Sequence, residues 1–155
     1  MDPTPAQDTL LLVCTYTNND ILAHLPKGEL GRGVYSLRLD ARTGALTPLS
    51  ASDVAPNPAF VLKHPTLPLV YCSTECIMRP EDADGSRAGK PSPQGHGELL
   101  TLRLNSDGTV AECAPRAHAG GRSTCFVTLV DRAHLAVVNY WDAVVALFEV
   151  SPRTG

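Results

Sequence analysis

Three stretches of the chain alternate between apolar and polar residues, with every second position apolar. They cover residues 33–39, 98–104 and 144–150, and the positions in between are mostly polar, although Leu147 is not. Side chains alternate between the two faces of a β-strand, so this pattern predicts strands with one covered face and one wet face. Each stretch leads into Asp, Asn or Ser and then Gly, which predicts a tight turn into another strand.

Between these stretches lie two pairs of segments that are apolar almost throughout. The first pair is 60–62 with 69–72, and the second is 126–129 with 135–138. Continuous apolar runs of this length are typical of strands that are buried on both faces. The order along the chain is therefore two buried strands, one half-wet strand and one outer strand, after which the order repeats.

This repeat predicts an all-β fold, a β-propeller built from four-stranded antiparallel blades. Blade one covers residues 10–50 and lacks its innermost strand. Blade two, 59–117, is complete, and blade three, 124–155, contains only its first three strands. We expect residues 1–9 to form a disordered tail.

Gly155 holds the place in its turn that Gly44 holds in the first copy of the repeat, so the chain stops inside a hairpin. A closed seven-bladed ring needs on the order of 300 residues at about 40–50 per blade. The pattern thus predicts about two and a half blades of a truncated chain. The alternative is a short open stack that completes itself by self-association through its open blade edges. The loop at 78–97, rich in Pro, Gly and charge, is expected to be mobile.

Composition narrows the choice of partners. The formal net charge of −3 provides no basic field for nucleic acid. The apolar run at 10–14 is too short for a signal peptide or a membrane span. The 5 cysteines are odd in number and include no Cys-x-x-Cys pair, which favours free thiols in a reducing, cytoplasmic setting. A zinc site built from Cys72, Cys76 and His96 lacks a recognisable ligand spacing.

Short motifs at equivalent points of the blades resemble those of one family. They are Cys-Thr-Tyr-Thr at 14–17, Asn-Pro-Ala-Phe at 57–60, His-Pro at 64–65, Tyr-Cys-Ser-Thr-Glu at 71–75, Ser-Thr-Cys-Phe-Val at 123–127 and Val-Asn-Tyr at 138–140. In order and spacing, from about residue 10 onward, the chain resembles the seven-bladed propeller lactonases, which include propeller-type 6-phosphogluconolactonases and carboxymuconate-cyclising enzymes. The resemblance implies hydrolysis of a sugar lactone, 6-phosphogluconolactone first, in the pentose phosphate pathway, with no metal or organic cofactor.

Blade topology gathers polar residues at one face. The innermost strand of a blade begins at the face where the second strand ends, and propellers bind ligands near the central channel. The candidate residues at these strand ends are Tyr16, Asn57, Glu75, Arg122, Asn139 and Tyr140.

Lactone opening needs an activated water and donors for the developing oxyanion, and a phosphorylated lactone also needs a cation. Glu75 is the catalytic candidate, as a base or as a partner of a sugar hydroxyl. Arg122 is the candidate for a phosphate or carboxylate. Tyr16, Asn57, Asn139 and Tyr140 are candidates for substrate binding. Structural roles stay open beside these: Glu75 as a loop cap, and Asn139 with Tyr140 as ties between blades.

Phe126 stands where the family carries a histidine that is a candidate for catalysis, and Phe cannot transfer a proton. A non-catalytic propeller that binds a ligand or a protein, or a relative of the carboxymuconate-cyclising enzymes, is therefore the alternative. A WD40-type scaffold fits less well, because Trp141-Asp142 begins a strand rather than ending one. We expect the 155-residue chain on its own to have no lactonase activity.

Overall fold

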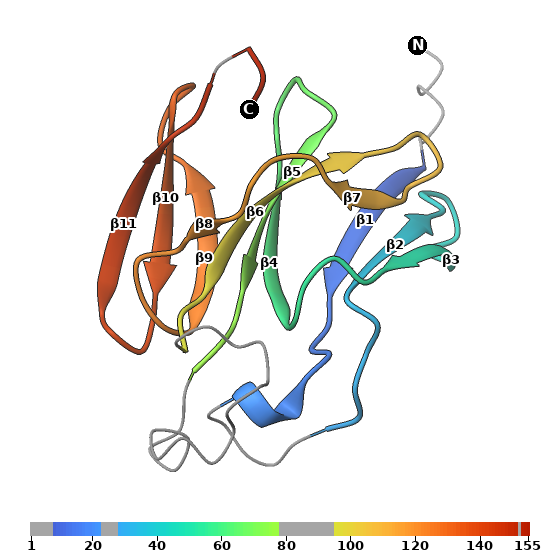
Figure 1. The fold of residues 1–155 in the computed structure, drawn as a ribbon. Coiled ribbons are helices and arrows are strands. Elements are labelled where there is room, and N and C mark those ends of the chain that lie inside the picture. Colours follow the sequence, from blue (N-terminus) through green and yellow to red (C-terminus); the bar gives the residue numbers. More distant parts are fainter. Residues whose placement is uncertain (1–7, 23–27, 78–94, 152) are drawn as a thin grey trace.

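The computed structural model describes residues 8–22, 28–77, 95–151 and 153–155. The strands form three antiparallel sheets that stand side by side as blades (Figure 1). The predicted tail lies outside the described residues apart from Asp8 and Thr9, and so does most of the predicted mobile loop at 78–97. The chain is thus a partial β-propeller, as the repeat predicts.

Blade one contains three strands in the order β1-β2-β3. They are β1 (Thr9–Cys14), β2 (Val34–Leu39) and β3 (Leu46–Ser52). Among the described residues β1 pairs only with β2, so no described strand lies inside β1 in this blade. One turn of 3-10 helix, η1 (Asn19–Ile21), follows β1.

Blade two holds the order β4-β5-β6-β7, with the short β8 also paired to β6. Its strands are β4 (Pro58–Lys63), β5 (Leu69–Thr74), β6 (Glu98–Leu104), β7 (Val110–Glu112) and β8 (Ala117–His118). Blade three has the order β9-β10-β11, and its strands are β9 (Thr124–Leu129), β10 (His134–Asn139) and β11 (Val144–Glu149).

Two apolar cores lie between the three blades. The first joins blades one and two through buried residues that include Val34, Cys72 and Leu100. The second joins blades two and three and includes Tyr71 and Val137. Every residue of β5 is buried, because β5 lies in the middle blade with a neighbouring blade on each side.

In blades two and three the apolar positions of the alternating stretches face the preceding blade. Leu100 and Leu102 pack in the first core, against blade one, and Phe148 packs in the second core, against blade two. In blade one the equivalent Leu37 belongs to neither core and is half-buried. Ser36, predicted on a wet face, is instead buried, because this face of β2 packs against blade two.

Blade three departs from the prediction of strands buried on both faces. Val127, Leu135 and Val137 are buried toward blade two. On the other face Val138 is only half-buried and Val145 is 66% exposed. No described sheet packs on that face, so the local apolar pattern overestimates burial there.

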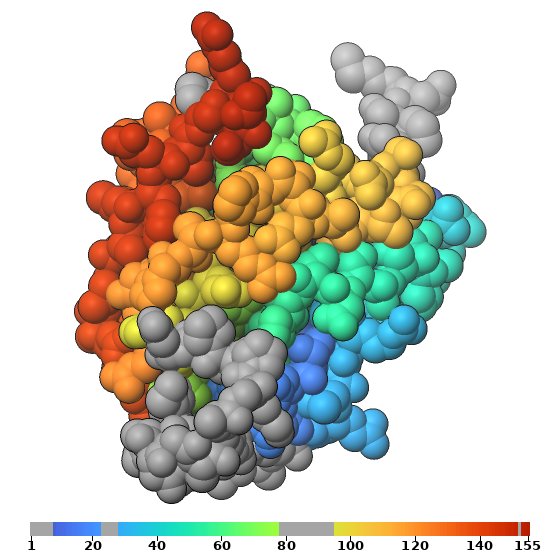
Figure 2. Space-filling model, viewed as in Figure 1, coloured from blue at the N-terminus to red at the C-terminus, as the bar shows by residue number. Residues whose placement is uncertain are grey.

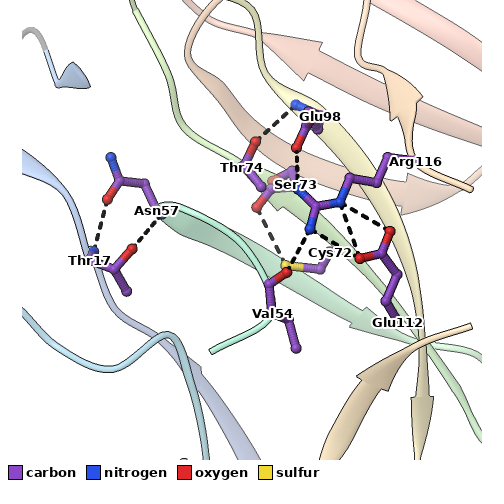
Figure 3. Close-up of polar contacts among 9 residues, drawn as sticks. All are labelled: Thr17, Val54, Asn57, Cys72, Ser73, Thr74, Glu98, Glu112 and Arg116. Carbon is purple, nitrogen blue, oxygen red and sulfur yellow. Dashed lines mark hydrogen bonds and ion pairs between the residues drawn. The ribbon is translucent and has the colours of Figure 1, made fainter. Parts of the chain in front are cut away.

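Arg116 links the two outer strands of blade two to the connection from blade one (Figure 3). Its guanidinium lies 3.0 Å from the carboxylates of both Glu98 and Glu112. It also donates to the carbonyl oxygen of Val54, at 3.0 Å, in the connection from blade one to blade two. Within the part of the chain that the structure describes, no helix is long and apolar enough to cross a membrane.

Candidate functional site

The predicted site residues lie at one edge of the three sheets, the lower edge in Figure 1. There β1, β5 and β10 end, while β4 and β9 begin. The antiparallel order of strands inside each blade produces this arrangement, since the first strand starts where the second ends. Side chains that are far apart in sequence therefore come together.

Asn57 ties blade two to blade one. Its side-chain Oδ1 accepts a hydrogen bond from the backbone N–H of Thr17 at 2.8 Å (Figure 3). The same Oδ1 accepts from the backbone N–H of Asn18 at 2.7 Å, and Nδ2 donates to the Asn18 carbonyl at 2.7 Å. The residue is fully buried and adopts a left-handed backbone with φ of 49°, which Asn tolerates better than most residues. The amide is thus engaged in holding the fold.

Glu75 stands where all three blades meet. The Tyr16 hydroxyl, just after β1, donates to its Oε2. The Ser123 hydroxyl, just before β9, donates to its Oε1 at 2.7 Å. The Glu75 backbone N–H donates to the carbonyl oxygen of Asn57 at 2.8 Å. The half-buried carboxylate is therefore oriented by groups from each blade.

The environment of Tyr16 keeps its hydroxyl protonated. Burial raises the pKa of Tyr16 above its usual range, and the hydrogen bond to the Glu75 carboxylate and the charge of that carboxylate raise it further. Ionised Tyr16 would face a carboxylate in a partly desolvated site, which is unfavourable. At neutral pH Tyr16 is thus a hydrogen-bond donor.

Arg122 is paired with Asp142. The guanidinium Nη2 lies 2.6 Å from Asp142 Oδ1, and the backbone N–H of Arg122 donates to Asp142 Oδ2 at 2.7 Å. The hydrogen bond to the carboxylate raises the pKa of Arg122, and the same contact lowers the pKa of Asp142. Both side chains are partly exposed, at 40% and 22%. An anionic ligand would have to share this guanidinium with Asp142.

Asn139 and Tyr140 end β10 in different settings. Asn139 is fully buried; its Oδ1 accepts from Thr124 Oγ1 at 2.7 Å and its Nδ2 donates to the Ala119 carbonyl at 2.8 Å. This amide joins blade three to the chain leaving blade two. The Tyr140 side chain is 70% exposed, so of these two residues it is the one accessible to a ligand.

Sequence reasoning missed Ser123 and Asp142 as members of the cluster. Ser123 holds the place before the first strand of blade three that Asn57 holds in blade two, so the blade repeat could have identified it. Nothing in the sequence identifies Asp142 as the partner of Arg122. The contact depends on how the turn between β10 and β11 folds back toward Arg122.

Phe126 and Cys72 pack among apolar side chains. The Phe126 ring lies 4.9 Å from that of Phe60, centroid to centroid, at the inner strands of blades three and two. Cys72 is buried in the first core, and its thiol donates to the carbonyl oxygen of Ser73 at 3.5 Å. Among the described residues, no group of three or more His, Cys, Asp or Glu side chains could hold a metal ion.

Comparisons with known proteins found one matching family model and similar solved structures. A family model described as lactonase, 7-bladed beta-propeller, matches residues 10–154. A structure from Bacteroides fragilis, provisionally described as a 6-phosphogluconolactonase, is similar with a TM-score of 0.67 and 19% identity over 97% of this chain. A second such structure, from Bacteroides uniformis, has a TM-score of 0.67 and 20% identity over 93% of the chain. No curated protein matches. The chain spans only 35% and 34% of the lengths of these two structures.

Proposed function

The chain belongs to the lactonase family of seven-bladed β-propellers, and on that basis we propose that it forms part of a site that opens sugar lactones by hydrolysis. The descriptions of the two Bacteroides structures favour 6-phosphogluconolactone as the type of substrate. The observation that carries the proposal is the Glu75 carboxylate, oriented by the hydroxyls of Tyr16 and Ser123 at the junction of three blades.

Hydrolysis of a lactone adds water to the carbonyl carbon and breaks the bond from that carbon to the ring oxygen. A positioned carboxylate can accept the proton of the attacking water, and we assign this role to Glu75. Tyr16 and Ser123 act as positioning residues, because they donate to different oxygens of the carboxylate and so fix its plane. The raised pKa of Tyr16 maintains its donor role at neutral pH.

Arg122 supplies the positive charge for an anionic group of the substrate. Its guanidinium is partly exposed, and Arg122 directly precedes Ser123 in the sequence. Arg binds phosphate and carboxylate through parallel hydrogen bonds. The existing contact with Asp142 lowers the affinity of this group for a ligand but also holds it in one orientation.

We also propose that the 155-residue chain alone does not turn over substrate. The chain covers about a third of the length of the two similar structures, 35% and 34%, so any group that the other parts of such proteins place around the channel is missing from it. The position of the family's histidine is occupied by Phe126, which cannot act in proton transfer. Binding and catalysis therefore need separate tests.

Binding is tested with 6-phosphogluconate, the stable product of the proposed reaction. We expect the chain to bind it with a Kd of about 1 mM by NMR titration, and Arg122→Ala to weaken binding by about tenfold, the loss of one charge-assisted contact. Arg132→Ala is the matched control, because this exposed arginine lies in the turn between β9 and β10 at the opposite edge. Equal weakening by both variants would contradict the assigned site.

Turnover is tested by following 6-phosphogluconolactone opening against the spontaneous rate. We expect no acceleration by the chain. Acceleration that disappears in Glu75→Gln would overturn the predicted inactivity and support the role of Glu75. Acceleration that survives this substitution would overturn both.

A non-catalytic ligand-binding propeller is the second candidate, and Phe126 is the observation that favours it. The ring packs against Phe60 and is still 42% exposed, so it offers an apolar contact where a proton carrier would stand. On this reading product binding persists in Glu75→Gln, and Phe126→His brings no turnover to any longer protein that contains these blades.

A further inference from the structure

His96 and His118 form a pair of imidazole rings at the junction of blades two and three. Their ring centroids lie 4.3 Å apart. His96 lies just before β6, and His118 ends β8, which pairs with the start of β6. Figure 2 shows the orange segment that includes β8 lying against the red strands of blade three. The two rings therefore belong to a contact between two blades that the structure describes.

The backbone before β6 holds His96 next to Arg122. The N–H of Gly97 donates to the carbonyl oxygen of Gly121 at 2.9 Å. His96 precedes the donor of this bond and Arg122 follows its acceptor, so the two residues flank one hydrogen bond between neighbouring segments. A β-carbon at Gly97 would lie 1.9 Å from Thr124 Oγ1, so the close approach requires glycine. The position of His96 beside Arg122 is thus fixed by main-chain contacts.

The His96 imidazole makes no hydrogen bond within the part of the chain that the structure describes. Its Nδ1 atom is shielded from water and has no partner there, although the residue as a whole is half-buried. His118 differs, because its Nδ1 accepts from the N–H of Gly120 at 3.0 Å. A buried polar atom without a partner is unfavourable, and such atoms commonly mark the place of a bound water, ion or ligand. Of the two rings, His96 is therefore the one that can take a ligand group.

Arg122 presents a guanidinium with one edge occupied and one edge open. Asp142 Oδ1 accepts from Nε at 2.9 Å and from Nη2 at 2.6 Å. Among the described residues Nη1 has no hydrogen-bond partner, and the side chain is 40% exposed. The edge formed by Nη1 and Nη2 can therefore bind an anion while the ion pair with Asp142 persists. Hydrogen bonds to Arg122 lower the pKa of Asp142 most, and the charge of His96 lowers it further, so His96 lies within electrostatic reach of this pair.

We propose that His96 and Arg122 together form an anion subsite that takes a phosphate monoester, with the imidazole on one phosphate oxygen and the open guanidinium edge on the others. A phosphate group offers a further oxygen to His96 after Arg122 has bound two, whereas a carboxylate does not, so the subsite favours phosphate. This assignment rests on the proposed function for the identity of the sugar, but the subsite itself needs only a phosphate group.

The subsite is tested by NMR titration of the 155-residue chain with inorganic phosphate, 6-phosphogluconate and gluconate. We expect the ring resonances of His96 to shift with the first two ligands and not with gluconate, which lacks the phosphate. His134 is the control within each spectrum, because it begins β10 at the opposite edge, where its ring contacts Asp131. Its resonances should stay in place.

Substitutions test the same contact by affinity. His96→Ala should weaken the binding of inorganic phosphate and of 6-phosphogluconate by about threefold to tenfold, the loss of one charge-assisted hydrogen bond. His134→Ala is the matched control and should bind both as the wild type does. His96→Gln keeps a neutral donor and should recover part of the loss. Circular dichroism melts show whether each variant is folded, and His96→Gln carries the test if His96→Ala is not.

The outcomes separate this subsite from the proposed function. If 6-phosphogluconate binds through Arg122 while His96 resonances stay in place and His96→Ala binds normally, the subsite is overturned and the proposed function stands. If inorganic phosphate shifts His96 but 6-phosphogluconate binds no more tightly than phosphate, the subsite is supported and the lactone chemistry is not. Equal shifts of His96 with gluconate and 6-phosphogluconate, or no shift with any phosphate ligand, would overturn the phosphate subsite.

Discussion

Blades two and three begin with the same backbone arrangement, which carries a different side chain in each blade. The residue before the first strand of each later blade adopts a left-handed backbone, with φ of 49° at Asn57 and 53° at Ser123. In both cases its carbonyl accepts the N–H of the residue that follows the second strand, at 2.8 Å from Glu75 and 3.0 Å from Tyr140. The side chains then diverge.

At the first interface the Asn57 amide reaches back to the backbone of blade one. At the second, the shorter Ser123 hydroxyl reaches the Glu75 carboxylate. The Asn57 amide uses its hydrogen bonds to join two blades, whereas the Ser123 hydroxyl orients an acidic side chain. This comparison teaches that one repeated position can be structural in one blade and part of a candidate site in the next.

The largest expected effect is at the structural position. Asn57→Ala removes three side-chain hydrogen bonds and puts a β-carbon residue without a local hydrogen bond into a left-handed backbone. We expect a loss of about 3 kcal/mol in the free energy of unfolding, measured with urea. In Asn57→Gly the left-handed backbone conformation stays accessible, so this variant should lose less of the free energy of unfolding. Equal losses would show that the amide, and not the backbone conformation, accounts for the whole effect.

Ser123→Ala should destabilise the chain less, by about 1–2 kcal/mol, because it removes one hydrogen bond to a charged group. A double-mutant cycle with Glu75→Gln separates this contact from the backbone effect. We expect the two substitutions to be coupled by about 1 kcal/mol. Additive losses would mean that the Ser123 hydroxyl does not act through Glu75, and the contrast with Asn57 would fail.

The Arg122–Asp142 pair predicts a small dependence of stability on pH. The pKa of Asp142 is lowered from 3.8 in the folded state by its hydrogen bonds to Arg122, so the unfolded chain binds more protons in that range. The stabilisation is therefore present above about pH 4 and is lost as the pH falls through the lower folded pKa. Thermal melts between pH 6 and 2.5 should show the wild type and Asp142→Asn converging at the acidic end. A constant difference would contradict this assignment.

The smallest expected effect is in the second core. The Tyr71 hydroxyl is buried and has no hydrogen-bond partner among the described residues. Tyr71→Phe removes a polar group that burial leaves unsatisfied, so we expect stability to be unchanged or to rise by up to about 1 kcal/mol. A clear loss in urea unfolding would show that the hydroxyl has a partner in solution.

Much of the fold could be predicted because its signals are local. The apolar runs and the turns predict the strands to within about two residues: the runs at 126–129 and 135–138 correspond to β9 at Thr124–Leu129 and β10 at His134–Asn139. The site was predictable only in part. Tyr16 and Glu75 were named from strand ends, but their contact joins positions 59 residues apart, and that of Ser123 with Glu75 joins positions 48 apart. The roles of Glu75, Arg122 and the other candidates in binding or catalysis stay predictions.

By itself the sequence determined the order of the strands, the blade repeat and the edge at which polar residues gather, since each follows from neighbours a few positions away. Only the tertiary structure decided which side chains are buried and which polar groups meet. Leu37 and Leu102 occupy equivalent places in one pattern, yet Leu102 is fully buried and Leu37 is not. The difference lies in the neighbouring blade, because burial depends on the sheet packed against a strand and not on the strand alone.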